Sequence, residues 1–156
     1  MVEANTITKN TAVSRGGGLY VYWGNLTING NTISGNSSAT GGGLYANYGI
    51  NTITENTVSH NTSSNSGGGM YLGGGSQTIT SNTIIWNTAS GHSQGTKGGG
   101  LYISDYDDSY GVGVQTIADN LIEDNTATGR GGGLYLLASA YNLTGNTISQ
   151  NSAPVG

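Results

Sequence analysis

Short stretches of alternating apolar and polar residues recur along the whole chain, and none of them follows the 3.6-residue period of a helix. In one stretch, Leu19 and Val21 fall on one face of an extended segment while Tyr20 and Tyr22 fall on the other. In the stretch at 32–34, an inward isoleucine is flanked by outward Thr and Ser. A period of two is typical of β-strands. The pattern therefore predicts many short strands and no helix.

Two motifs repeat with nearly constant spacing. The motif Gly-Gly-Gly-Leu/Met-Tyr occurs five times, and its fourth residue is Leu19, Leu44, Met70, Leu101 and Leu134 in turn. After each copy come two shorter units of the form Ile-x-x-Asn, which recur every 25 or 26 residues apart from one longer step across the fourth repeat. Regular repeats of this length are the signature of a solenoid, in which each repeat forms one coil.

The pattern and the repeats together predict an all-β fold, a right-handed parallel β-helix of about five coils with three short strands per coil. Residues 1–156 are expected to form one domain. The coil boundaries are expected at a partial coil 1–15, which supplies a single strand, and at full coils 16–41, 42–66, 67–97, 98–130 and 131–156.

The asparagines of the short units are expected to form two structural ladders. Equivalent residues of adjacent coils lie about 4.8 Å apart, so their side-chain amides can hydrogen bond along the axis. Asparagine also tolerates the left-handed backbone region that tight bends require. The first ladder comprises Asn5, Asn31, Asn56, Asn82, Asn120 and Asn146, and the second comprises Asn10, Asn36, Asn61, Asn87, Asn125 and Asn151.

Composition narrows the function classes. The chain has 29 glycines, no cysteine, 8% charged residues and a net charge of −4. Without cysteine there is no disulfide and no thiol nucleophile. Four basic residues argue against nucleic-acid binding. No apolar run approaches the roughly 18 residues that cross a bilayer, so no membrane insertion is expected.

Two groups of residues are candidates for ligand binding. A row of tyrosines is expected along one outer face: Tyr20, Tyr45, Tyr71, Tyr102 and Tyr135. These rings could stack on sugar rings or contact a partner molecule. The alternative is that tyrosine occurs there only because it favours β-strands. In the fourth coil, Asp105, Asp107 and Asp108 are candidate calcium ligands, because calcium prefers several oxygen ligands. The alternative for these carboxylates is a solvated acidic loop. Calcium is the one cofactor that the sequence suggests.

The glycine motif followed by paired Ile-x-x-Asn units resembles the repeats of the polymorphic outer-membrane protein family. More broadly it resembles right-handed β-helix proteins of the pectate-lyase-like superfamily. Those outer-membrane repeats carry Gly-Gly-Ala and Phe-x-x-Asn, whereas this chain has Gly as the third residue and no Phe. The resemblance implies a β-helix, a secreted or surface location and a role in adhesion. It carries over no catalytic residue, because the matching positions are structural.

The leading functional hypothesis is a non-enzymatic extracellular or cell-surface module, a β-helix rod acting as a filament subunit or an adhesin stalk. Open strand edges can pair, so end-to-end self-association is expected. A glycan or a host or cell-surface ligand is the other expected partner. Two alternatives stay open. One is a carbohydrate-binding or polysaccharide-processing β-helix that uses the acidic and tyrosine-containing loop of coil four, and the other is an ice-binding solenoid that uses outward threonine rows.

Overall fold

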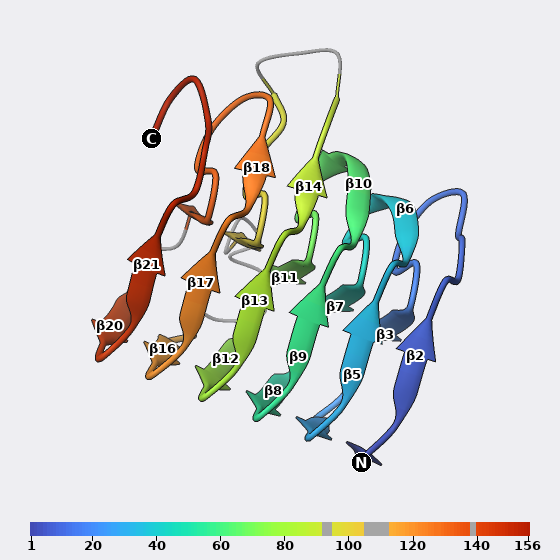
Figure 1. Cartoon of the computed structure of the whole chain (residues 1–156). Coiled ribbons are helices and arrows are strands. Elements are labelled where there is room, and N and C mark those ends of the chain that lie inside the picture. The colour runs from blue at the N-terminus through green and yellow to red at the C-terminus, as the bar shows by residue number, and fades with distance from the viewer. Residues whose placement is uncertain (92–94, 105–112, 138–139) are drawn as a thin grey trace.

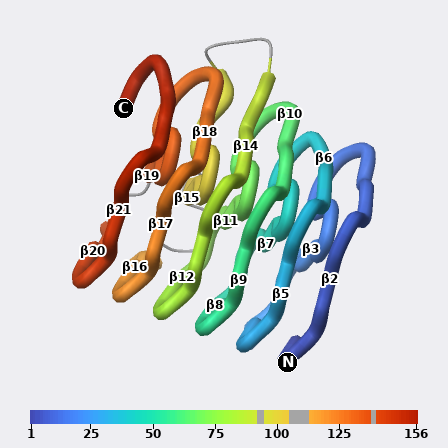
Figure 2. Tube along the Cα trace, in the orientation of Figure 1, coloured from blue at the N-terminus to red at the C-terminus, as the bar shows by residue number. Residues whose placement is uncertain are grey.

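The computed structural model describes residues 1–91, 95–104, 113–137 and 140–156. In these residues the chain forms 21 strands and no helix. The strands wind through successive coils that lie side by side from the N-terminus to the C-terminus (Figure 1). The backbone tube shows each coil beside the one that precedes it in the sequence (Figure 2). The prediction of an all-β parallel solenoid of about five coils is confirmed.

Equivalent strands of successive coils pair in four parallel sheets, here called sheets A to D. Sheet A contains β1 (Val2–Glu3), β4 (Thr27–Asn29), β8 (Ile50–Thr54), β12 (Ser76–Thr80), β16 (Gln115–Ala118) and β20 (Tyr141–Thr144). Sheet B contains β2 (Thr6–Thr8), β5 (Thr32–Ser34), β9 (Thr57–Ser59), β13 (Thr83–Ile85), β17 (Leu121–Glu123) and β21 (Thr147–Ser149).

Sheet C contains β6 (Ser37–Thr40), β10 (Thr62–Ser66), β14 (Thr88–Ala89) and β18 (Thr126–Ala127). Sheet D contains β3 (Leu19–Tyr22), β7 (Leu44–Asn47), β11 (Met70–Gly73), β15 (Leu101–Ser104) and β19 (Leu134–Leu137). The expected three strands per coil is therefore corrected to four. Sheet C escaped the pattern because its strands are short and bury small residues such as Ser38, Ser63 and Ala89, so they lack large alternating apolar side chains.

Two expected boundaries also change. The segment 1–15 supplies β1 to sheet A and β2 to sheet B, and Thr11 and Arg15 bridge to Ser37 and Thr40 at the position of sheet C. It therefore holds three strand positions of a coil, and the expectation of a single strand was wrong. The second full coil begins at Gly41, one residue earlier than expected, because Gly41 occupies the same corner as Gly16 and shares its backbone φ near +60°.

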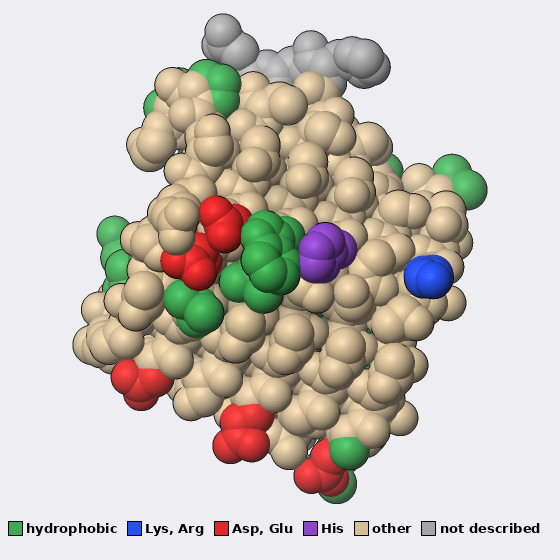
Figure 3. All heavy atoms as spheres, in the orientation of Figure 1, with side chains coloured by type: hydrophobic (Ala, Val, Ile, Leu, Met, Phe, Trp, Pro, Cys, Tyr) green, Lys and Arg blue, Asp and Glu red, His purple; other side chains and the backbone are tan. Residues whose placement is uncertain are grey.

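The corners between sheets A and B and between sheets B and C are made by a residue in the left-handed region. At these corners the left-handed residue is the one before each ladder asparagine, for example Glu55 (φ 55°) before Asn56 and His60 (φ 55°) before Asn61. Residues here project outward, so charged and aromatic types are tolerated. The face in Figure 3 is mostly uncharged, with scattered acidic side chains and a single basic one.

The glycine triplets form the corner between sheets C and D, here called the C–D corner. Gly41 has a φ of +65°, where a side chain is strained. A Cβ on Gly42 would collide with the carbonyl oxygen of Gly68 in the next coil. A Cβ on Gly43 would lie 2.9 Å from the side chain of Asn61. Each glycine of the triplet is therefore required for a different steric reason. At the third position, occupied by Gly43, the contact with Asn61 excludes the Cβ of an alanine.

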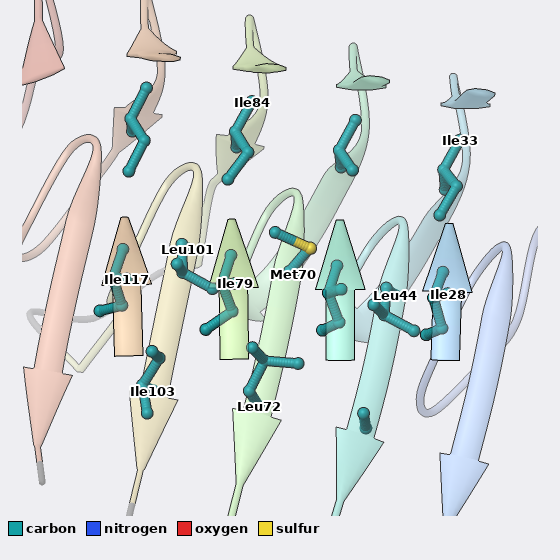
Figure 4. Packing of buried hydrophobic residues seen from close by; sticks show 14 residues of the cluster. Ile28, Ile33, Leu44, Met70, Leu72, Ile79, Ile84, Leu101, Ile103 and Ile117 are labelled. Atoms are coloured by element: carbon teal, nitrogen blue, oxygen red, sulfur yellow. The ribbon is translucent and has the colours of Figure 1, made fainter. Parts of the chain in front are cut away.

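The core is a set of aliphatic stacks that run parallel to the coil axis. Strands β4, β8, β12 and β16 of sheet A pair in register, so Ile28, Ile53, Ile79 and Ile117 stack one on the next. Ile33 and Ile84 of sheet B and Leu44, Met70 and Leu101 of sheet D pack in the same interior (Figure 4). These side chains are fully buried. Each stabilises the fold by about 1.5–3 kcal/mol relative to exposure in water.

Candidate functional site

Both sets of ladder asparagines form continuous chains of hydrogen bonds along the axis. Around Asn61, the Oδ1 atom accepts from the backbone N–H of Asn36 at 2.9 Å and from its Nδ2 at 3.0 Å. The Nδ2 of Asn61 donates to the Ile33 carbonyl at 2.9 Å and to Asn87 Oδ1 at 3.0 Å. The same pattern crosses the long fourth repeat from Asn87 to Asn125. These residues hold coils together and are not available to a ligand.

A third file of buried amides lies at the start of sheet A, and the sequence analysis missed it. Asn51 Nδ2 donates to Gln77 Oε1 at 3.0 Å, and the backbone N–H of Gln77 donates to Gln115 Oε1 at 3.2 Å. The signal was present, because each of these residues precedes a Thr-Ile pair. Leu26 lies opposite Asn51 in the preceding coil, so the file ends there and Asn51 Oδ1 has no hydrogen-bond partner among the described residues.

The five tyrosines predicted to form a row lie on the outer face of sheet D and stack along the axis. Ring centroids are 5.3 Å apart for Tyr20–Tyr45, 4.8 Å for Tyr45–Tyr71, 4.9 Å for Tyr71–Tyr102 and 5.6 Å for Tyr102–Tyr135. Tyr45 and Tyr102 are only 4% and 6% exposed, whereas Tyr20 is 48% exposed. Because Tyr45 is covered by a ring on each side, its faces are not free to stack on a sugar.

A groove of about 320 Å³ lies beside this tyrosine stack at the C–D corner. It is lined by Arg15, Thr40, Tyr45, Asn65, Ser66, Tyr71, Gly95, Lys97 and Tyr102, none of which is acidic. The Arg15 Cζ atom lies 5.2 Å from the centroid of Tyr45, and Lys97 Nζ lies 5.9 Å from that of Tyr102 and 5.4 Å from that of Tyr135. Both cations therefore lie beside the tyrosine stack.

The two cations of the groove belong to one file of the repeat. Arg15 pairs with Thr40, Thr40 with Ser66, Ser66 with Lys97, and Lys97 with Arg130. Each of these residues directly precedes a glycine triplet. Three of the chain's four basic residues therefore share one edge of the solenoid. This file was not predicted from the sequence, although its signal is visible there as a basic residue before three of the five triplets.

Protonation keeps the groove positive. Burial raises the pKa of Tyr45 and raises the pKa of Tyr71 to about 12. The pKa of Arg15 is also raised, mainly by the charge interaction with Tyr45 and further by a hydrogen bond with Tyr20. At neutral pH these phenols are neutral and the guanidinium is charged. The phenols therefore do not neutralise the positive charge of the groove.

A second surface cluster lies at the corner between sheets B and C. The His60 and Trp86 rings are 5.0 Å apart, and Trp86 Nε1 donates to Asp124 Oδ2 at 3.1 Å. Glu123 Oε1 accepts from Ser149 Oγ and Gln150 Nε2, and these hydrogen bonds lower the pKa of Glu123. Figure 3 shows histidine, hydrophobic and acidic side chains adjoining on this face. The carboxylates already have partners, so this is a bonded surface cluster and not a pocket.

A family model described as a right-handed beta helix region matches residues 1–155. The chain belongs to the right-handed β-helix family. Comparisons with curated proteins and with solved structures found no match. The family description agrees with the parallel coils of this β-helix. The finer resemblance to polymorphic outer-membrane repeats stays a prediction.

The other predicted site of this β-helix lies outside the described residues. The candidate calcium ligands Asp105, Asp107 and Asp108 fall in the segment 105–112, and so does most of the coil-four loop. Among the described residues, no group of three or more His, Asp or Glu side chains is arranged to hold a metal. The described part of the chain also contains no helix long and apolar enough to cross a membrane.

Proposed function

We propose that this β-helix is a non-enzymatic structural module, a rigid rod in an extracellular or cell-surface protein. The observation that supports the proposal is the continuity of the asparagine ladders across every coil. A rod needs connections along its axis, and here each coil is joined to the next by backbone pairing in four sheets and by two side-chain ladders. The ladder asparagines recur in every coil and serve these connections.

The ladders supply rigidity without covalent links. In the interior coils, two buried asparagines hold the backbone of the neighbouring coil by side-chain hydrogen bonds, as Asn82 does with the carbonyl of Ile53 and Asn87 with that of Val58. Buried hydrogen bonds of this kind are costly to break, at about 1–3 kcal/mol for each group left unpaired. Because the chain has no cysteine, resistance to unfolding under tension must come from these hydrogen bonds and from the aliphatic stacks.

The surface location and the stalk or filament role extend this proposal. They rest on the resemblance of the glycine and Ile-x-x-Asn motifs to outer-membrane protein repeats, and on the chemistry of stacked coils. A further coil can continue every sheet and both ladders, whether it comes from the same polypeptide or from a second copy. End-to-end association is thus the self-interaction that this architecture favours.

Single-molecule pulling tests the mechanical role. The chain is held between two handle proteins and stretched along its length. Unravelling one coil of 25 or 26 residues lengthens the chain by about 90 Å at roughly 3.5 Å per residue. We expect force peaks separated by such increments. Extension without resolved force peaks would contradict a load-bearing rod.

Two further measurements test the remaining parts of the proposal. Release of reducing ends or unsaturated sugars is measured after incubation with neutral and acidic polysaccharides, and any turnover would overturn the non-enzymatic assignment.

Electron microscopy over a concentration series, with calcium or with EDTA, separates the filament role from the stalk role. Filaments with a repeat of about 4.8 Å along their axis support a fibre subunit. Persistent single particles support a stalk segment and remove self-assembly from the proposal.

A further inference from the structure

The groove at the C–D corner differs from the rest of the described surface in charge. It is hollowed beside the tyrosine stack, and Arg15 and Lys97 both line it. The described acidic residues lie elsewhere: Glu3 and Glu123 are on sheets A and B, and Glu55, Asp119 and Asp124 are at the corners that carry the ladders. Among the described residues, a positive groove is thus present on a chain of net negative charge, and it is complementary to an anion.

The geometry of the groove suits an elongated ligand that lies along the axis. Arg15 and Lys97 are three coil steps apart through Thr40 and Ser66. At roughly 4.8 Å per step their backbones are about 14 Å apart. A small inorganic anion cannot reach both cations at once. A ligand with acid groups distributed along its length can.

The chemistry of the lining selects the type of anion. The faces of Tyr45 are covered by Tyr20 and Tyr71, with interplanar angles of 11° and 7°, so a ligand beside Tyr45 meets the edge and hydroxyl of the ring and not an open face. A binder of single-stranded nucleic acid uses open aromatic faces on which bases stack. Phenol, threonine, serine and asparagine groups instead match the hydroxyls of a sugar chain.

We propose that the C–D groove binds an anionic glycan, with Arg15 and Lys97 contacting its acid groups and the polar side chains between them contacting its hydroxyls. The site is independent of the mechanical role, because the groove cations are outside the ladders. Thr40 and Ser66 occupy the same file in the coils between Arg15 and Lys97, so the fold does not require a cation there. The binding chemistry is common to carboxylate and sulfate groups.

Isothermal titration calorimetry of the whole chain tests the proposal with four anionic probes and one neutral probe. Alginate supplies carboxylates, dextran sulfate supplies sulfate esters, poly(U) and poly-glutamate supply other polyanions, and neutral dextran supplies sugar without charge. We expect alginate, dextran sulfate or both to bind, and neutral dextran not to bind. Which of the two binds more tightly identifies the acid group. Tighter binding of poly(U) or poly-glutamate, or equal binding of neutral dextran, would overturn the proposal.

Variants inside and outside the groove separate binding at the groove from the effect of overall charge. The double variant Arg15→Gln/Lys97→Met should lower affinity by about ten-fold or more, since each cation makes charge-assisted contacts. Lys9→Met removes an exposed cation at another corner and should change affinity less than about two-fold. Circular dichroism of each variant checks the fold. Equal losses in the Lys9 variant and the double variant, or no loss in the double variant, would contradict a specific groove.

Discussion

The corners that carry the asparagine ladders and the C–D corner that carries the groove arise from the same repeat, yet their polar atoms have different partners. At the ladder corners, Asn61 is fully buried, and its Oδ1 and Nδ2 bind neighbouring coils. At the C–D corner, Arg15 and Lys97 interact with tyrosine rings and line an open groove. One region connects coils and the other faces solvent.

The difference shows how function can be read from a solenoid. A residue that recurs in every coil, such as the ladder asparagine, satisfies a demand that every coil has. A residue that appears in some coils only, such as Arg15 where the next coil has Thr40, is not needed by the fold at that position. Departures from a repeat are therefore the better candidates for binding, and substitutions in the two regions should differ in their effect on stability.

The largest effect is expected at a ladder corner. Asn61→Ala removes the acceptor of the Asn36 backbone N–H and the side-chain donor to the Ile33 carbonyl, both in the interior. With the small cavity that remains, the free energy of unfolding should fall by about 3 kcal/mol. Urea denaturation followed by circular dichroism measures the change.

Asn29→Ala is the matched control for this ladder variant. Asn29 lies on the outer side of the same solenoid and donates to Glu3 Oε1 at 3.1 Å. Its replacement should change the free energy of unfolding by no more than about 0.5 kcal/mol. Equal effects at the two asparagines would mean that burial in the ladder adds nothing to stability.

The second effect concerns the backbone of the C–D corner itself. In Gly42→Ala, the new Cβ meets the carbonyl oxygens of Gly68 and Thr62, so adjacent coils must separate locally. We expect a loss of about 2 kcal/mol, typical of overpacking. Gly24→Ala is the control, because no heavy atom lies within 4 Å of its added Cβ. If Gly42→Ala left the free energy of unfolding unchanged, the C–D corner would have space for a Cβ atom, contrary to the close contacts in the structure.

The third effect is smaller and completes the comparison. Arg15→Gln and Lys97→Met each remove a cation from a ring at the surface, which should lower the free energy of unfolding by less than about 1 kcal/mol. Thermal and urea denaturation of each variant beside Asn61→Ala measures the contrast. If either loss were as large as that of the ladder variant, the cations would belong to the scaffold and the distinction between the two regions would fail.

Much of this architecture was predictable from the sequence, and the failures have specific physical reasons. Isoleucine alternation and asparagine spacing predict the aliphatic stacks and the two ladders, because both depend on contacts between identical positions. Sheet C was missed because Ser63 and Ala89 give no alternating apolar signal. The groove was missed because it depends on a file of outward residues next to another strand, and the proximity of Arg15 to Tyr45 follows from coil geometry and not from sequence separation.

The smallest effect at neutral pH is expected inside the tyrosine stack, where alkaline titration reveals it. Burial raises the pKa of Tyr71 to about 12, above the usual value near 10, so the folded chain holds this proton more tightly than the unfolded chain. Stability from this group is present below about pH 10 and is lost as pH rises towards 12. Tyr71→Phe should remove the last step in tyrosinate absorbance and flatten the fall of stability over that range. Tyr141→Phe, at a half-exposed tyrosine outside the stack, should leave that step in place. If Tyr71→Phe left the last titration step unchanged, that step would not belong to Tyr71. The Tyr71 hydroxyl would then be accessible to water, and the tyrosine stack would not form a buried side of the groove.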